Sequence, residues 1–412
     1  MEKLSSYLNL NSIFLFFFLI VGLIPSFGSI DKIGSQWLYL SIINVCFYLF
    51  FDFKSSGFRG LTFLKSNLFI SFSFFLFFIL ISIFSSNNIS ESIISISRWL
   101  IVFITFVSLT YLLASFKDFL SLISFVFLII VCCELSFIYI TYYDIVSIAS
   151  YKYDYSTFLI GVAGNKNVAA SILALKIPFI FYILHKSKNL KFQFFIVLIL
   201  FFSFYALFLI NSRTILLSIL ICTFLSILYF LFFKKNKMFS WILIPLFSVF
   251  IFSINPLNDF SDKSLITNKL TLSESNIAAR FEFYNLALNH FFSNPFLGVG
   301  IGNWKVDSLQ YQNYKMKDYT VSYHVHNDFI ELAVETGFFG LISYISIFLA
   351  SFIYLFKIRD ELYSLIIGSS FLIYFIDSNL NFPMSRVSNQ IIFALILAIL
   401  YNLQIRKNEE FS

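Results

Sequence analysis

The stretch FQFFIVLILFFSFYALFLI, residues 192–210, carries no charged side chain over its whole length. A helical apolar run of about 20 residues matches the hydrocarbon core of a bilayer. The run stops at the short polar break NSRT, residues 211–214, and a second apolar run follows at once. Two such runs joined by so few residues predict a helical hairpin within a membrane.

The composition of the whole chain follows the same pattern. Of the 412 residues, 59% are hydrophobic and 12% are charged, and phenylalanine alone contributes 60. Ordinary soluble domains have about 25% charged residues. The net charge of +6 is spread between the apolar runs, which excludes a basic nucleic-acid-binding domain. The cysteines lie inside apolar runs and indicate neither disulfides nor a zinc site.

Apolar windows predict an all-α polytopic membrane protein with about 12 transmembrane helices. The first run is expected to be a span and not a cleaved signal peptide, because Pro25 to Ser29 is a poor cleavage site. The predicted spans are residues 10–24, 36–51, 67–84, 92–114, 118–142, 168–184, 192–210, 214–233, 238–254, 337–356, 362–376 and 388–404.

The basic residues predict the orientation of these spans. With both termini in the cytoplasm, every inner connection carries Lys or Arg, and the short outer connections carry far fewer. This is the positive-inside bias of membrane proteins. The inner basic residues are Lys54, Arg59, Lys65, Lys117, Lys186, Lys188, Lys191, Lys234, Lys235, Lys237, Lys357, Arg359, Arg406 and Lys407.

The predicted organisation has three parts: residues 1–254 with nine spans, a long periplasmic loop over 255–336, and residues 337–412 with three spans and a cytoplasmic tail. Loops this long are usually functional or disordered. Helical spacing within the loop predicts an amphipathic helix on the outer surface, started by Ser273 or Ser275 and ended by Asn294 and Pro295. A glycine-containing turn follows over 298–304. The apolar residues that set the spacing are Phe281, Tyr284, Leu288 and Phe291.

The end of this loop closes the only long polar segment of the chain. YHVHNDFIELAVETGFFG, residues 323–340, holds two of the four histidines. Imidazole titrates near neutrality and can take a proton from an attacking hydroxyl. We therefore expect His326 to be a general base, oriented by Glu331 or Asp328. A histidine that merely satisfies a helix entry is the open alternative, more so for His324.

Arginines form the second group of candidates. The guanidinium fork binds two oxygens of a phosphate at once, so Arg213 and Arg280 together are suited to clamping a diphosphate. Arg98 and Arg386 also lie on the predicted outer side. Contact with lipid headgroups or carboxylates is the alternative for all of them.

Two further kinds of site are disfavoured by the sequence. No His-x-x-x-His pair and no Asp-x-Asp is present, which argues against a metal site. The glycine turn lacks the Gly-x-Gly-x-x-Gly fingerprint and no strand precedes it, so it is not a dinucleotide site. We expect a tight turn, with backbone N–H groups offered to a ligand as a further option. Trp304, Tyr311 and Tyr314 offer ring faces to sugars or simply pack.

Two charges fall inside predicted spans. Glu134 and Lys176 lie at equal depth on consecutive spans, where each would cost about 2.5–3.5 kcal/mol alone. We predict that they form a structural ion pair; a proton relay is the functional alternative.

Several short motifs in order resemble the O-antigen ligase and polymerase superfamily of bacterial surface-glycan enzymes. Coverage runs from about residue 164 to 383 and is densest over 279–340. The matching elements are GNKNVAA at 164–170, NSRT at 211–214, Ala279-Arg280, NPFLGVG at 294–300, HNDF at 326–329, ETG at 335–337 and NFP at 381–383.

The resemblance implies a GT-C-like membrane fold and a metal-independent inverting glycosyltransferase without a cofactor. Its donor would be a glycan on undecaprenyl diphosphate, and its site would face the periplasm from the bacterial inner membrane. Carried onto this chain, Arg213 and Arg280 bind the diphosphate and His326 is the catalytic base. The supporting residues are His324, Asn327, Glu331, Asn167, Arg98 and Arg386.

The acceptor is left open by the resemblance. A ligase transfers the glycan to lipid A-core, a polymerase joins lipid-linked repeats, and a relative modifies protein hydroxyls. The stretch from His326 to Gly337 favours the ligase. A polytopic transporter is the rival from another class, supported by the Glu134–Lys176 pair and by Pro178 within a span. No symmetry between halves supports it, and the polar residues gather at one face and not at midplane.

Overall fold

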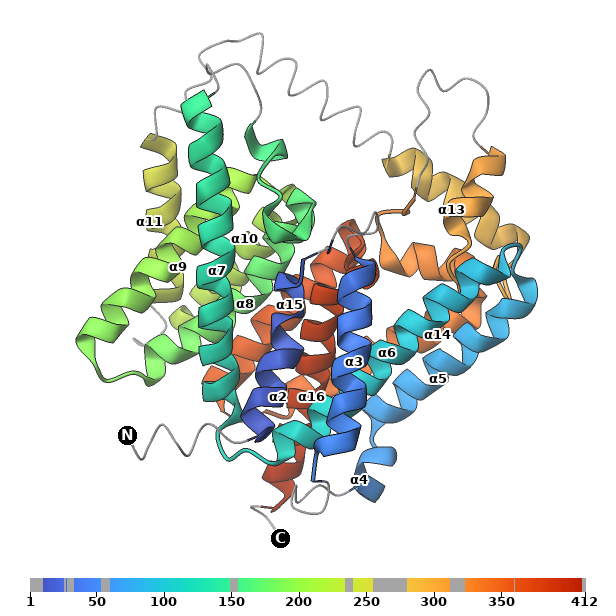
Figure 1. The fold of residues 1–412 in the computed structure, drawn as a ribbon, viewed down its shortest axis with the longest axis horizontal. Coiled ribbons are helices and arrows are strands. Elements are labelled where there is room, and N and C mark those ends of the chain that lie inside the picture. The colour runs from blue at the N-terminus through green and yellow to red at the C-terminus, as the bar shows by residue number, and fades with distance from the viewer. Residues whose placement is uncertain are drawn as a thin grey trace.

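The computed structural model describes residues 10–25, 27, 33–52, 60–148, 155–233, 240–254, 280–311, 323–358 and 360–409. Over these ranges the protein is helical and contains no strand (Figure 1). Residues 280–293 are helical as well. The α-helices are α2 (Leu10–Leu19), α3 (Gly34–Phe50), α4 (Gly60–Leu64), α5 (Asn67–Ser82), α6 (Ile89–Ala114), α7 (Phe119–Ile148), α8 (Lys166–Lys186), α9 (Leu190–Ile210), α10 (Arg213–Phe233), α11 (Ser240–Ile254), α13 (Trp304–Asp307), α14 (Asp328–Phe356), α15 (Glu361–Leu380) and α16 (Val387–Glu409).

Short 3-10 helices complete the described structure. They are η1 (Ile20–Leu23), η2 (Ile83–Ser85), η3 (Tyr155–Thr157), η4 (Gly161–Ala163), η7 (Ser308–Tyr311) and η8 (Pro383–Ser385).

The predicted all-helical class is confirmed, and each of the predicted spans coincides with a helix. In the described part of the chain, 8 helices are long and apolar enough to cross a membrane: α5, α6, α7, α8, α9, α14, α15 and α16. The others are shorter or less apolar over their described length; α2 with η1, and Arg213–Leu228 of α10, are examples. The count of twelve spans therefore stays a prediction.

Asparagine side chains start four of the long helices. The first N–H groups of a helix have no partner within it, and this is costly next to lipid. Asn88, Asn165, Asn189 and Asn327 each precede a helix and accept hydrogen bonds from its first turn. Asn211 ends α9 in the left-handed conformation, with φ of 54°, which asparagine tolerates. The break NSRT is therefore a tight turn between α9 and α10.

The interior of the bundle is built on α8. Every residue from Val168 to Leu184 is buried, against α7, α9 and α15. Within this core the Lys176 ammonium pairs with the Glu134 carboxylate of α7, and both side chains are buried. The predicted ion pair is confirmed. It joins two helices across the apolar interior.

The pair yields a stability prediction. Glu134→Gln leaves the Lys176 charge buried without a counter-ion, and breaking such a pair costs about 3–5 kcal/mol. We expect a clear drop in the midpoint of thermal unfolding of the purified protein in detergent. The double variant Glu134→Gln with Lys176→Met removes both charges and should recover most of that loss. A single variant as stable as the unmodified protein would contradict the structural role.

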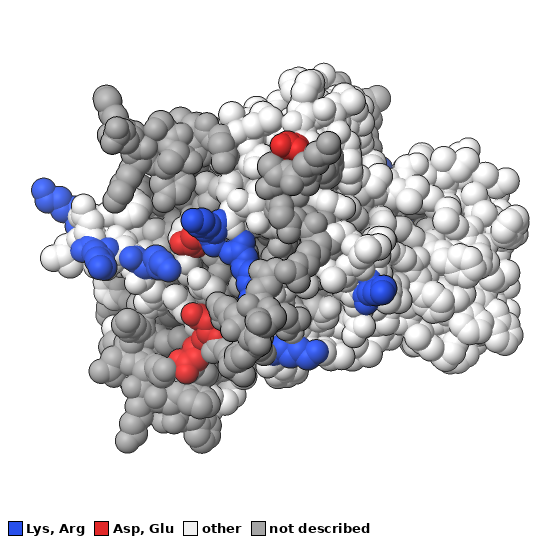
Figure 2. Space-filling view, turned by 90° about the horizontal axis from the view of Figure 1, so that it is seen from below, with Lys and Arg blue, Asp and Glu red and all other residues white. Residues whose placement is uncertain are grey.

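Two groups of helices flank the centre of the molecule. In Figure 1, α7 to α11 form one side, and α5, α6 and α14 lean away on the other, with α2, α3 and α16 between them. In the same view, helix 280–293 and α13 lie above the upper ends of α5 and α6. Figure 2 views the lower face, where Lys and Arg outnumber Asp and Glu on the described surface. The described parts of the predicted inner connections lie at this lower end.

Candidate active site

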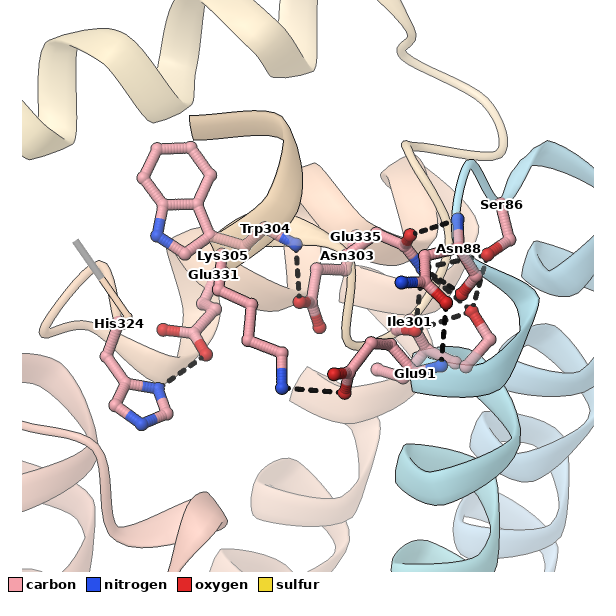
Figure 3. A network of polar contacts seen from close by, with 11 residues as sticks. Ser86, Asn88, Glu91, Ile301, Asn303, Trp304, Lys305, His324, Glu331 and Glu335 are labelled. Carbon is pink, nitrogen blue, oxygen red and sulfur yellow. Dashed lines mark hydrogen bonds and ion pairs between the residues drawn. The ribbon is translucent and has the colours of Figure 1, made fainter. Parts of the chain in front are cut away.

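The segment over 298–311 is fixed to the turn between α5 and α6 by a compact polar network (Figure 3). The Asn303 amide donates to the hydroxyls of Ser86 and Ser92 at 2.8 Å, and its carbonyl oxygen accepts from the Asn88 N–H at 2.7 Å. Lys305 pairs with Glu91 at 2.6 Å. These contacts hold the segment against two helix ends.

A second anchor joins this segment to α14. The helix is interrupted at Gly337, which has φ of 70° and ψ of −170°. At the interruption the Phe338 N–H donates to the Pro295 carbonyl at 2.8 Å, and the Val299 N–H donates to the Val334 carbonyl at 2.9 Å. The interruption separates an apolar arm after Gly337 from a polar arm over 328–336. It falls where the sequence placed the end of the loop.

His326 is held in an unusual backbone conformation beside the polar arm of α14. Its φ is 63°, in the left-handed region that few non-glycine residues adopt. The Tyr284 hydroxyl of helix 280–293 donates to the His326 carbonyl at 3.1 Å. The imidazole Nδ1 is buried and has no hydrogen-bond partner among the described residues. Strain of this kind persists where surrounding structure imposes it, often at functional sites.

Phe382 organises both histidines. The His324 ring stacks on it with centroids 4.5 Å apart, and the His326 ring meets it edge-on at 5.0 Å. The Arg386 guanidinium lies 5.2 Å from the centre of the same ring. Phe382 belongs to the NFP motif, far from the histidines in sequence. Its ring sets the spacing of three polar groups.

Glu331 orients His324 and not His326. One carboxylate oxygen lies 3.0 Å from His324 Nδ1, and the other accepts the Val325 N–H at 2.8 Å. Asp328 accepts the Met384 N–H at 3.2 Å. The expectation that Glu331 or Asp328 orients His326 is therefore wrong for the described contacts. The left-handed backbone at His326 breaks the extended alternation, so the His326 ring does not follow His324 to Glu331 and instead lies within the influence of Arg280.

The electrostatic environment keeps His326 neutral. Burial first, then the positive charge of Arg280 and the neighbouring His324, lower the pKa of His326 from 6.5 to about 4, while Glu331 opposes them. A neutral imidazole at physiological pH retains the lone pair that a general base needs.

Three of the candidate arginines lie around this cluster. Arg280 begins the described part of helix 280–293 and donates to the Leu380 carbonyl at 3.2 Å, close enough to act on His326. Arg386 lies on Phe382, and Arg98 of α6 lies 5.8 Å from the centre of the Trp37 ring. Arg213 is exposed at the first position of α10. The described contacts do not link Arg213 to the histidines.

Comparison with known families bears directly on this cluster. Residues 198–345 match the O-antigen ligase family. The resemblance found in the sequence is thereby confirmed over that stretch, which contains Arg213, Arg280, His324, His326 and Glu331. No curated protein sequence matches the chain. Phe382, Arg386, Arg98 and Asn167 lie outside the O-antigen ligase match.

Both candidate asparagines lie at helix starts. Asn327 caps α14 by accepting from the Phe329 and Ile330 N–H groups, and it donates to the Asn379 carbonyl at 2.9 Å. Asn167 is the second residue of α8, and its backbone N–H is bound by Asn165. Asn327 thus positions the residue next to it, His326, within the O-antigen ligase match.

The glycine turn is a packing device. Gly298, Gly300 and Gly302 all have positive φ, as a tight turn requires. The N–H groups of Ile301 and Trp304 are bound within the protein, by Ser82 and by Glu335. These two are therefore not offered to a ligand, in contrast to one of the options left open by the sequence.

The remaining predictions concern the aromatic residues and the ends of the helix before the glycine turn. Trp304 is 1% exposed and packs in a small core, so packing is the alternative observed for it and its ring face is not offered to sugars. Ser273, Ser275 and Tyr314 lie outside the described residues, as does the side chain of Tyr311. The predicted helix end at Asn294 and Pro295 is confirmed.

A cavity that is partly open to solvent lies beside the cluster. Its walls come from α3, α6, the turn at 301–305 and the polar arm of α14, and His324, Glu331 and Glu335 lie along it. Sequence reasoning missed Glu335 and Trp37 as site residues. Glu335 carried a signal, since it is part of the ETG motif. Among the described residues, no group of three or more His, Cys, Asp or Glu is arranged to hold a metal ion.

Proposed function

We propose that the protein transfers a glycan from undecaprenyl diphosphate to an acceptor hydroxyl at the periplasmic face of the bacterial inner membrane. The family match supports activity of the ligase or polymerase type on a lipid-linked glycan. The observation that carries the proposal is a neutral His326 beside Arg280, with a cavity next to the two histidines. His326, Arg280 and part of the cavity wall belong to the stretch that matches the O-antigen ligase family. The excess of basic residues on the opposite face supports the orientation.

The proposed step needs one base and one cationic site. The acceptor oxygen attacks the anomeric carbon as its proton passes to the His326 imidazole. The bond from that carbon to the diphosphate oxygen breaks, and its electron pair leaves with the lipid diphosphate. Attack opposite the leaving group inverts the anomeric configuration. Arg280, with Arg213, stabilises the charge that develops on the diphosphate.

We favour ligation to lipid A-core, with polymerisation of lipid-linked repeats as the second candidate. The stretch from His326 to Gly337 supports the ligase. The test is a deletion strain whose surface glycan is separated on a gel. Full-length glycan stranded on the lipid carrier indicates a ligase. Core bearing a single repeat indicates a polymerase. Unchanged surface glycan would refute both, and would revive transport as a function.

The pH profile of transfer should reflect the low pKa of His326. The base is active when neutral, and its pKa in the folded protein is about 4 instead of 6.5. Transfer should therefore hold steady as the pH falls through 6.5 and lose half its rate only near 4. Initial rates measured across this range with purified protein in detergent check this. A fall centred on 6.5 would mean that His326 is solvated or is not the base.

Metal independence is a further part of the proposal. The diphosphate is an activated leaving group, and arginines can neutralise its charge in place of a metal. We expect transfer to continue in excess EDTA at an unchanged rate. Loss of activity under EDTA with rescue by one particular divalent metal would overturn this part alone.

A further inference from the structure

The cavity beside the histidines contains an unsatisfied donor. Trp37, in the first turn of α3, lines it and is 6% exposed. Its indole N–H meets no acceptor among the described residues. A buried N–H left without a partner costs about 1–3 kcal/mol. Such a group on a cavity wall is well placed to donate to a bound ligand.

The charges on the cavity wall balance. Arg98 contributes a cation and Glu331 a carboxylate, whereas burial and the neighbouring Glu331 raise the pKa of Glu335 to about 8, so that Glu335 is mostly uncharged at neutral pH. Lys305 pairs with Glu91, at the rim. The buried Glu331 carboxylate repels a phosphate or a second carboxylate that would bind beside it. The balance favours an uncharged ligand that both donates and accepts hydrogen bonds.

Both glutamates of the cavity wall already make hydrogen bonds within the protein. Glu335 accepts the Trp304 N–H at 3.0 Å, and Glu331 is used by His324 and Val325. A carboxylate has about four lone-pair sites, so further donors can still bind to these oxygens. The Arg98 guanidinium lies near the Trp37 ring, which fixes its position.

We propose that this cavity is the acceptor subsite and that it holds an uncharged sugar residue of the acceptor glycan. The inference rests on the proposed function. Sugar hydroxyls donate to Glu331 or Glu335 and accept from Trp37 and Arg98. The cavity reaches His324, whose stacking on Phe382 places it next to His326. The attacking hydroxyl thus enters from the α3 and α6 side, and Arg280 is not on the cavity wall.

The test is photo-crosslinking of the full-length protein in cells of its own host. Tyr323 lines the cavity and is 64% exposed, so Tyr323→p-benzoylphenylalanine introduces a reactive ring at modest structural cost. The matched control is Phe292→p-benzoylphenylalanine, an equally exposed aromatic on helix 280–293 that is not on the cavity wall. Adducts are purified under denaturing conditions, stained for sugar after periodate oxidation, and analysed by mass spectrometry.

We expect a sugar-bearing adduct at Tyr323 and none at Phe292. Combining Trp37→Phe with the Tyr323 variant keeps an aromatic ring at position 37 but removes the indole N–H. The yield of the sugar adduct should then fall by up to about tenfold, the effect of one lost hydrogen bond. Adding Arg280→Ala, which weakens donor binding, should leave the adduct in place. Loss of the adduct with Arg280→Ala would assign the cavity to the donor. Adducts of phospholipid or protein alone, or adducts in which the crosslinked sugar residue itself carries a phosphate or carboxylate, would overturn the proposal.

Failure of the proposed function is detected separately. Surface glycan in a His326→Ala strain measures transfer, and the Tyr323 adduct measures sugar binding. A sugar adduct together with normal surface glycan in the His326→Ala strain would refute the catalytic assignment and keep the sugar-binding cavity.

Discussion

Replacing His326 with alanine should lower glycan transfer by about two to four orders of magnitude, the usual contribution of a positioned general base. Arg280→Ala should cause a loss of similar severity, because the departing diphosphate would lose a charge partner. Neither change removes a large part of the core, so both variants should remain inserted and abundant. Surface glycan on a gel and protein level by immunoblot measure the two quantities side by side.

His185 supplies the matched control for this prediction. It lies in the last turn of α8, at the opposite end of that helix from the site, and His185→Ala should leave transfer unchanged. His324→Ala is the informative companion, since His324 has the carboxylate partner and His326 does not. We expect an intermediate loss, because His324 positions the Phe382 ring and lines the cavity. Normal surface glycan with His326→Ala, together with complete loss with His324→Ala, would move the base to His324.

The sequence predicted the features that are set by residues close together in the chain or on consecutive spans. The apolar runs predicted the helices, because a continuous stretch of leucine, isoleucine and phenylalanine has one stable form in lipid. The Glu134–Lys176 pair followed from equal depth on adjacent spans. The polar stretch at 323–340 marked the histidines, and the end of helix 280–293 followed from Asn294 and Pro295.

The sequence did not predict the contacts that form the site between segments that are not consecutive spans. Phe382 lies more than fifty residues from His326, and one aromatic among many gives no signal of its own. Trp37 reaches the cavity only because α3 packs against α6. The assignment of Glu331 to His324 depended on the left-handed turn at His326, which spacing alone did not reveal. In each case the tertiary fold decided the partner.

Gly337→Ala should also eliminate transfer, through the backbone and without touching the catalytic groups. At Gly337 the φ of 70° strains any side chain, and a Cβ would lie 2.2 Å from the Phe296 carbonyl oxygen. Gly298 stands in the reciprocal position, where a Cβ would lie 2.3 Å from the Val334 carbonyl oxygen. The strained conformation alone costs about 1–3 kcal/mol. The clash adds to it, so the 295–299 segment must separate from α14.

Separation of this kind would carry Glu335 away from the turn at 302–304 and open the wall of the cavity. We therefore expect Gly337→Ala and Gly298→Ala each to lose transfer, and limited proteolysis to cut more rapidly within 280–311. Gly368→Ala on α15 is the control, because its Cβ would meet Leu355 at an ordinary 3.5 Å. Full transfer and unchanged proteolysis in the Gly337→Ala protein would show that α14 can straighten there without loss. The kink would then be incidental to the site. If the protease pattern changes while transfer persists, the docked segment is needed for rigidity and not for chemistry.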